Sequence, residues 1–327
     1  MTTSHGPKSD WRPLADTQTL RARAELLREL RAFFSARGVL EVETPQLVSH
    51  ATTDTHLASF ATRFSGPGAH DGQELYLSTS PELAMKRLLA AGSGPIFQIC
   101  RAFRNGEKGR RHNPEFTILE WYRPGLDHIA LMAEIEELLA VALGVDRCDR
   151  ITYQAVFEQE LGVSPHQTSV ALLEEVAADR DLSLSSFADV DEGLQFLLAE
   201  VIEPSLGIDR PIFVYDYPVS QAALARIRSD TPPVAERFEV YFKGVELANG
   251  FHELADAEEQ RRRFEDDRAS RERRGLPIPQ LDEAFLDALD FGLPQCAGVA
   301  LGLDRLLMLQ IGADTIEEVL AFPLCRA

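Results

Sequence analysis

Hydrophobic residues recur every three or four positions over residues 17–37, with arginines between them, which predicts an amphipathic helix. The apolar positions of this helix are Leu20, Ala24, Leu27, Leu30 and Phe34. Gly38 is a typical C-cap, and an extended segment that ends at Pro45 follows it. A further helix is predicted over residues 81–91, with proline near its first turn.

Strand-type patterns fall into two groups, one toward each end of the chain. The first group comprises residues 75–78, 96–104 and 116–123, and the second comprises residues 211–215, 238–247 and 297–301. Residues 127–208 between them carry mainly helical periodicity, including 129–143 and 194–202, and a helix over 304–311 follows the last strand. Strands at both ends with helices between them predict an α+β fold with a large, mostly antiparallel sheet.

The charge balance is strongly acidic, with 33 Lys and Arg against 52 Asp and Glu and a net charge of −19. Such a surface repels nucleic-acid backbones unless basic residues cluster locally. One such cluster comprises Lys108, Arg110 and Arg111. The basic stretches 261–263 and 271–274 are interleaved with acidic residues, so we interpret them as solvated helix faces.

The cysteines and the hydrophobic runs indicate the compartment. The four cysteines are scattered without CxxC spacing, which argues against a zinc site or a disulfide framework and suits a reducing environment. No apolar run approaches the ~20 residues that span a bilayer, and the N-terminus lacks the apolar core of a secretion signal. We therefore expect a cytoplasmic protein with no membrane association.

Three segments carry candidate chemistry. The loop between the strands at 96–104 and 116–123 presents Arg104 beside the basic cluster, which suits a polyphosphate because guanidinium groups bind phosphate oxygens in pairs. Phe116 offers a ring face for a purine. Taken alone, this segment is equally consistent with an exposed basic hairpin.

The second segment, residues 246–253, places Glu246 and Glu253 where two carboxylates could hold Mg²⁺ against bound phosphates. The third is a strand of small residues, 298–302, that leads into a helix with Arg305 in its first turn. An acidic strand edge and tight strand–helix packing are the structural interpretations of these two segments. GxxxxGK[ST] and GxGxxG motifs after a strand do not occur, which excludes the common nucleotide-binding folds.

In this order the segments resemble the catalytic domain of class II aminoacyl-tRNA synthetases, and the lysyl-tRNA synthetase branch in particular. The helix through Phe33 and Phe34 with residues 43–45 resembles the first motif, residues 103–122 the second, and residues 302–305 the third. The resemblance implies an antiparallel sheet flanked by helices in a single catalytic domain over residues 16–327. An N-terminal tail of residues 1–15 would precede it, and the mainly helical region 127–208 would lie within it.

The resemblance also implies residue roles. Arg104 and Arg305 would act in catalysis by holding the phosphates of ATP. The residues implied to bind ATP are Arg104, Asn105, Gly106, His112, Asn113, Phe116, Glu246, Leu247, Gly302 and Arg305. Those implied to bind a lysine-type amino acid are Ser80, Pro81, Glu82, Glu120, Tyr122, Asn249, Glu253 and Ala300, and those implied to hold Mg²⁺ are Glu246 and Glu253.

Lysyl-tRNA synthetases carry an anticodon-binding domain ahead of this core, and here only about 16 residues precede the first motif. An acidic lysyl-type core without that domain is similar to the elongation factor P–(R)-β-lysine ligase family. This resemblance implies that ATP activates (R)-β-lysine, which is then transferred to a lysine side chain of elongation factor P, without charging of tRNA. A homodimer formed through the first motif is also implied.

Two departures and two alternatives accompany this interpretation. Gly106 stands where the synthetases have a glutamate, with Glu107 next to it, and Ala300 stands where they commonly have glycine. A minimal lysyl-tRNA synthetase-like enzyme that charges tRNA or another small acceptor is one alternative, and a non-catalytic nucleotide-binding paralogue is the other. Retention of Arg104, Arg305 and the two glutamates favours catalysis.

Overall fold

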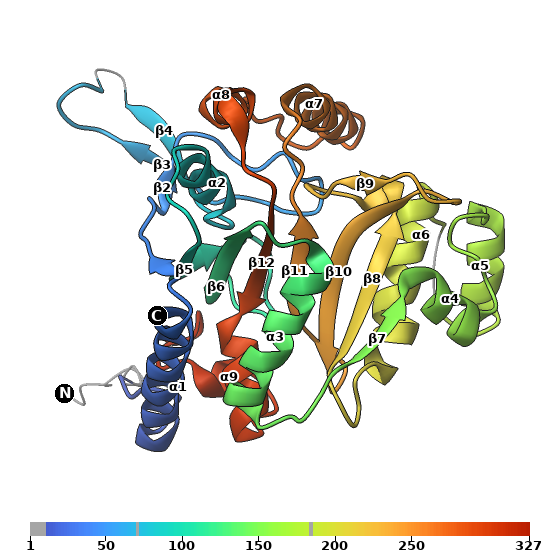
Figure 1. The fold of residues 1–327 in the computed structure, drawn as a ribbon, viewed down its shortest axis with the longest axis horizontal. Coiled ribbons are helices and arrows are strands. Elements are labelled where there is room, and N and C mark those ends of the chain that lie inside the picture. Colours follow the sequence, from blue (N-terminus) through green and yellow to red (C-terminus); the bar gives the residue numbers. More distant parts are fainter. Residues whose placement is uncertain (1–10, 70–71, 183–185) are drawn as a thin grey trace, which may run out of the picture.

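A large mixed sheet forms the centre of the molecule (Figure 1). The computed structural model describes residues 11–69, 72–182 and 186–327. Within these ranges nine strands form the main sheet, in the order β1-β5-β6-β12-β11-β10-β8-β7 with β9 beside β10, and three more form a small sheet in the order β2-β4-β3. The β1–β5 and β7–β8 pairs are parallel, and the other pairs are antiparallel.

The strands are β1 (Leu40–Glu41), β2 (Leu47–Val48), β3 (Ala61–Phe64), β4 (Gln73–Leu77), β5 (Ile96–Phe103), β6 (Glu115–Pro124), β7 (Asp149–Thr152), β8 (Ile212–Pro218), β9 (Ile227–Arg228), β10 (Val234–Phe242), β11 (Val245–His252) and β12 (Cys296–Gly302). The helices are α1 (Thr17–Ala36), α2 (Glu82–Ala90), α3 (His128–Leu143), α4 (Tyr153–Leu161), α5 (Val170–Ala178), α6 (Val190–Leu197), α7 (Ala257–Arg273), α8 (Glu283–Gly292) and α9 (Leu303–Ile311). Short π or 3₁₀ segments cover Leu198–Ile202, Glu203–Ser205, Val219–Gln221 and Ile316–Val319.

Helices α1, α3 and α9 cover one face of the sheet and contain much of the largest core. Phe34 of α1 stacks on Phe97 of β5, with ring centroids 4.4 Å apart, and meets Trp121 of β6 edge-on. Asp16 caps α1 by accepting from the backbone N–H of Thr19, and the chain leaves the helix through Gly38 at φ +67°. The predicted helix at 17–37 is therefore confirmed, although Leu20 and Ala24 of its apolar stripe lie exposed.

The predicted helical region 127–208 begins with α3, and its later helices α4, α5 and α6 pack against the outer strands of the sheet and form a second core with β8 and β10 (Figure 1). Stacked Tyr153 and Phe157 from α4 lie in this core beside Tyr217 of β8. The region also contains β7, which the pattern did not predict. Four residues with no buried side chain among them are too short and too polar to show the alternation that marks a strand.

Helices α2, α7 and α8 enclose a third core around Met85, Phe264 and Phe285. In α7 the predicted solvated basic face is wrong for Arg271, which is 6% exposed. Its guanidinium donates to the carbonyls of Asp54 and Leu57 at 2.6 and 3.2 Å, and so holds the loop at residues 49–59.

The predicted strand at 238–247 is in fact two antiparallel strands, β10 and β11. Lys243 and Gly244 form the turn between them with φ angles of +51° and +67°, a pair of left-handed residues typical of tight hairpins. The hydrophobic pattern did not reveal this turn because a lysine in the left-handed region is uncommon.

The predicted N-terminal tail of residues 1–15 lies partly outside the described residues, which begin at Trp11. Leu14 and Ala15 donate backbone hydrogen bonds to the carbonyls of Ala321 and Leu320, and Ala15 is 1% exposed. These two residues therefore belong to the folded unit. None of the described helices is long and apolar enough to cross a membrane. The four cysteines, all in described segments, are unpaired.

Candidate active site

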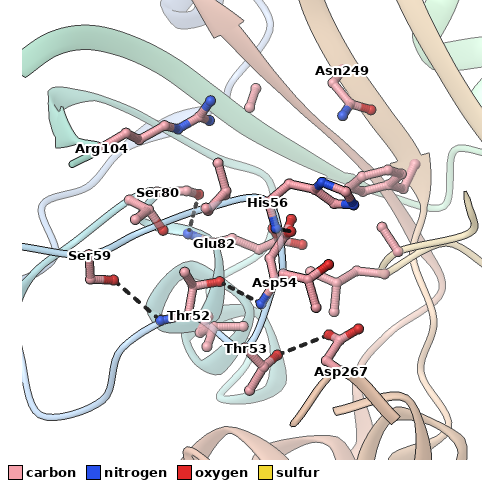
Figure 2. A pocket seen from close by; sticks show the side chains of 18 of the residues that line it. Thr52, Thr53, Asp54, His56, Ser59, Ser80, Glu82, Arg104, Asn249 and Asp267 are labelled. Atoms are coloured by element: carbon pink, nitrogen blue, oxygen red, sulfur yellow. Dashed lines mark hydrogen bonds between the residues drawn. The ribbon is translucent and has the colours of Figure 1, made fainter. Parts of the chain in front are cut away.

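A cavity of about 1260 Å³ opens over β6, β10, β11 and β12, between α2, α7 and the loop at residues 49–59. Figure 2 shows Ser80, Glu82, Arg104 and Asn249 around it, with the loop passing across the view. Thr53 of this loop donates to Asp267 of α7 at 3.1 Å, so the loop is fixed at one wall of the cavity. The volume suffices for a nucleotide together with a small amino acid.

Arg305 lies at one end of the cavity, in the first turn of α9. Its Nη1 donates to the carbonyl and carboxylate of Glu246 at 2.7 and 3.2 Å, and its Nη2 contacts His112 Nε2 at 2.7 Å. Burial and the charge of Arg305 lower the pKa of His112, so the imidazole is neutral near pH 7 and can accept this hydrogen bond. The guanidinium is thereby held in one orientation within the cavity.

Arg104 lies at the end of β5, above the ring of Phe116, with its guanidinium carbon 5.1 Å from the ring centroid. Its Nη1 is 3.7 Å from Glu107, the glutamate next to Gly106. The side chains of Arg104 and Phe116 both line the cavity, to which they present a cation and a ring face. Asn113 lines it too, but its side chain donates to the carbonyl of Glu115 and accepts from the N–H of Leu324, so it fixes the C-terminal segment.

Three glutamates, Glu82, Glu120 and Glu253, gather beside the part of the cavity that Ser80 lines. Glu120 is 1% exposed and accepts from Ser80 Oγ at 2.8 Å and from Tyr122 Oη at 2.7 Å. Burial, reinforced by the charge of Glu82, raises the pKa of Glu120 to about 7. Burial also raises the pKa of Glu253 to about 8, although the ammonium of Lys86 acts in the opposite direction.

Lys86 lies between two of these glutamates. Its Nζ is 2.7 Å from Glu82 Oε1 and 2.5 Å from Glu253 Oε2, and its side chain is 1% exposed. Gly298 of β12 makes room beside this group, because a Cβ there would collide with both the Tyr122 ring and the Glu253 carboxylate. The small-residue strand noted in the sequence thus makes room for side chains of the site.

Comparisons with known proteins agree with this geometry. Residues 9–326 match the model of the family described as class II tRNA synthetases (D, K and N). The chain is 54% identical to the elongation factor P–(R)-β-lysine ligase of Yersinia enterocolitica over 98% of this chain and 99% of the relative. It is 53% identical to the ligase of the same name from Pseudoalteromonas translucida, over 97% and 98%, and 52% identical to that of Salmonella paratyphi B, again over 97% and 98%.

This chain belongs to the class II aminoacyl-tRNA synthetase family, and within it to the elongation factor P–(R)-β-lysine ligases. The predicted class II fold, with its large and mostly antiparallel sheet, is confirmed. Membership of this family implies that the ligase uses ATP.

The structure brings most of the predicted site residues to the one cavity. Those that line it are Ser80, Pro81, Glu82, Arg104, His112, Asn113, Phe116, Glu246, Leu247, Asn249, Ala300, Gly302 and Arg305. Glu120, Tyr122 and Glu253 lie buried behind this lining, joined to it through Ser80 and Lys86. Asn105 and Gly106 are exposed in the loop after β5, outside the lining. The roles of all these residues in the ligase stay predictions.

Sequence reasoning missed several charged residues of the site, notably Glu203 and Glu239 in the cavity lining and Lys86 buried behind it. Glu239 of β10 accepts from Arg237 at 2.5 Å and from Tyr241, and all three side chains line the cavity. Their spacing of two residues, which places all three on one face of β10, was a signal that could have revealed them. Lys86 gave no such signal, because a lysine four residues after Glu82 is typical of any exposed helix.

The carboxylates around Glu246 suit a divalent cation. Burial and the charge of Glu246 raise the pKa of Glu203 to about 7, and Glu239 acts on Glu203 in the same direction. Although burial acts in the opposite direction, the charges of Arg305 and Arg104 lower the pKa of Glu246, so its carboxylate is ionised and could hold Mg²⁺. Glu253, the other predicted Mg²⁺ ligand, is instead paired with Lys86, so its metal role stays a prediction that the geometry does not favour.

Proposed function

We propose that this ligase activates (R)-β-lysine with ATP as an adenylate and transfers the β-lysyl group to a lysine side chain of elongation factor P. The observation that carries the proposal is the division of one cavity into two charge environments. Arg104 and Arg305 line one part of it together with Glu246, and Glu82 lines another part, with Glu120, Glu253 and Lys86 buried behind the lining. A substrate with an ammonium-bearing end and a carboxylate can lie between them, with its carboxylate toward the phosphates of ATP.

Activation needs no protein nucleophile. The carboxylate oxygen of the amino acid attacks the α-phosphorus of ATP, an O–P bond forms, and pyrophosphate leaves. Arg104 would stabilise the charge that develops on the α-phosphate and Arg305 that on the γ-phosphate, while Phe116 stacks on adenine. Mg²⁺ held at Glu246, with Glu203 and Glu239 as neighbours, would supply further neutralisation of phosphate charge.

Transfer forms the new amide bond. The deprotonated ε-amine of the acceptor lysine attacks the carbonyl carbon of the adenylate, the C–O bond to AMP breaks, and the amine nitrogen loses its proton. The β-lysyl ammonium groups would be held meanwhile by Glu82 and, deeper in the cavity, by Glu120 and Glu253, with Ser80, Tyr122 and Asn249 orienting them. Because the acceptor belongs to the translation machinery, we place the reaction in the cytoplasm.

Two assays test this proposal. Pyrophosphate exchange with a panel of amino acids should be fastest with (R)-β-lysine and slower with α-lysine. Intact-mass measurement should then show one added β-lysyl unit on elongation factor P, with tRNA left uncharged in an acid-precipitation assay. Efficient charging of tRNA without a mass shift on the protein would favour a minimal synthetase, and absence of exchange would favour a non-catalytic paralogue.

We also propose a homodimer built on α1. Leu20 and Ala24 lie exposed on this helix, whereas Leu26, Leu30 and Phe34 are buried in the protomer's own core. The outward apolar positions are therefore free for a two-fold contact. Sedimentation should show a dimer at micromolar concentration, and Leu20→Glu should yield monomers; a wild-type protein that sediments as a monomer would contradict this assembly.

A further inference from the structure

Lys86 is a fully enclosed cation among the substrate-binding glutamates, and the sequence interpretation gave it no role. It lies on α2 one turn after Glu82, and its ammonium bridges Glu82 and Glu253 at 2.7 and 2.5 Å. A buried ammonium has to be paired with carboxylates, because an isolated charge inside a protein is very costly. Both of its partners are residues to which the proposed function assigns an ammonium of the substrate.

The identity of this residue is informative because the chain strongly prefers arginine. Only Lys8, Lys86, Lys108 and Lys243 are lysines among its 33 basic residues. A compact ammonium with three donors fits between two carboxylates, whereas a planar guanidinium demands more room and a fixed fork geometry. A lysine at the most enclosed basic position therefore indicates a requirement for that geometry.

The charge count of the group is also informative. With Glu82, Glu120 and Glu253 ionised, the three carboxylates and one ammonium sum to −2. The substrate class under the proposed function carries two ammonium groups, so the bound complex would be neutral around these side chains. Without Lys86 the group would reach −3, and carboxyls buried this deeply would take up protons instead.

We propose that Lys86 is a positioning residue that holds Glu82 and Glu253 in place and favours loss of the Glu253 proton when a substrate with two ammonium groups binds. This inference rests on the proposed function and deepens it, because it names what tunes the amino-acid end of the cavity. Lys86 touches no reacting atom. It acts through the two carboxylates, and its single positive charge gives the group, once its carboxyls are ionised, the net charge that a diamino acid neutralises.

The competing interpretation is that Lys86 merely fixes α2 to β11 as a structural salt bridge. The two interpretations differ in what a neutral replacement does. Loss of a structural bridge destabilises the protein and affects ATP and amino acid alike, at every pH. Loss of a charge-setting residue raises the pKa of Glu253, so amino-acid binding weakens below that pKa and recovers as the pH rises.

The experiment compares Lys86→Met with the wild-type enzyme and with Lys243→Met, a matched control at an exposed lysine on the β10–β11 turn. KM for (R)-β-lysine and for ATP is measured by pyrophosphate exchange between pH 6 and 9. Removing a nearby opposite charge moves a carboxyl pKa by about 1–3 units. We therefore expect the acid limb of kcat/KM for the amino acid to move up by at least about 1 pH unit, with KM at pH 7 raised about tenfold and KM for ATP unchanged.

Two further measurements keep the inference open to refutation if Lys86→Met folds poorly. Lys86→Arg should lie closer to wild type than Lys86→Met in its pH profile, because it keeps the charge. Titration calorimetry of the wild-type enzyme in buffers of different ionisation enthalpy should show proton release when (R)-β-lysine binds near pH 7. An unmoved acid limb in Lys86→Met, or binding to wild type without proton release, would overturn the inference while leaving the proposed function intact. Absence of exchange by the wild type with any lysine-type amino acid would overturn the proposed function as well.

Discussion

Two charged clusters meet at neighbouring residues of the chain, at the end of β11. Glu253 belongs to the substrate end of the cavity, with Lys86, Glu82 and Glu120 around it. His252, one residue earlier, belongs to a second cluster, where its Nδ1 is 2.7 Å from Glu236 and its Nε2 is 3.3 Å from Arg226. Successive side chains of a strand point to opposite faces, so adjacent residues serve different environments.

The two clusters differ in how completely their charges are balanced. In the His252 cluster, Arg228 binds Asp216 at 2.7 Å and Asp230 at 2.8 Å and lies 3.7 Å from Glu236, while Arg226 contacts His252, so each carboxylate faces a guanidinium group. His128, Glu236 and His252 could approach one metal ion. However, both nitrogens of His252 already have partners, and the neighbouring arginines oppose a further cation.

The Glu253 cluster, in contrast, has three carboxylates for one ammonium. Its surplus is visible in the pKa of Glu120, raised to about 7, and in that of Glu253, raised to about 8, both chiefly by burial. Ionised carboxyls that are unfavourable in the empty protein become favourable once a cationic ligand arrives. In this protein the buried cluster with unpaired carboxylates lies against the cavity, whereas the cluster of paired charges around His252 forms a structural network.

The largest expected effect is a difference in activity between substitution of an arginine in the cavity and substitution of an arginine in the His252 cluster. Arg305→Ala should lower adenylate formation by about 3–4 kcal/mol of transition-state energy, because it removes a positioned donor to developing phosphate charge. Arg228→Ala is the matched control, and it should reduce the melting temperature while leaving pyrophosphate exchange close to wild type. Comparable losses of exchange in both variants would remove the distinction between the clusters.

The next effect concerns glutamates on the two faces of the sheet. Glu120→Gln should weaken binding of a lysine-type amino acid by about 1.5–3 kcal/mol, the value of a charge-assisted hydrogen bond, with ATP binding preserved. Glu236→Gln should instead destabilise the fold and spare amino-acid binding, since its partners are His252 and Arg228. Calorimetric titration of each variant with each ligand decides between these outcomes, and equal loss of both ligands in Glu120→Gln would point to misfolding.

A smaller effect is expected where the backbone makes room for the unbalanced cluster. Gly298→Ala would introduce a methyl group against Tyr122 and Glu253. Overpacking of this kind costs about 1–3 kcal/mol, and here the displaced groups include the amino-acid site. Chemical denaturation should show the loss of stability and exchange assays a raised KM for the amino acid, and a variant that is normal in both would show that the site tolerates the methyl group.

Much of the fold and the nucleotide end of the site could be predicted from the sequence, and the reasons are physical. The apolar spacing of long helices such as α1 and α3 is enough to predict them. Arg104, Phe116 and Arg305 belong to short motifs that can be recognised within one segment of the chain. The amino-acid end depends on long-range approach instead. Lys86 and Glu253 are distant in the chain, and only the packing of α2 against the sheet shows that they form one charged group.

The smallest effect, and the most direct measure of charge imbalance, is the pH dependence of amino-acid binding. The folded-state pKa values of Glu120 and Glu253, about 7 and about 8, lie above the ordinary value of 4.5. Because these pKa values are higher in the folded protein than in the unfolded one, protonation of the two carboxyls stabilises the ligand-free folded state. This stabilisation is fully present below about pH 4.5 and is lost as the pH rises through 7 to 8. The ammonium groups of the substrate bind the ionised carboxylates, so the affinity for the amino acid increases as the pH rises.

We therefore expect affinity for (R)-β-lysine to rise by about tenfold or more between pH 6 and pH 8, since each proton released on binding contributes up to a factor of ten per pH unit. The melting temperature of the ligand-free enzyme should fall over the same interval, while the increase on adding the amino acid should grow. Glu120→Gln should flatten the slope by removing one titrating group, and Glu236→Gln should leave it unchanged because it lies in the balanced cluster. An affinity that is constant from pH 6 to pH 8 in the wild type would show that the Glu253 cluster is already balanced before the substrate arrives.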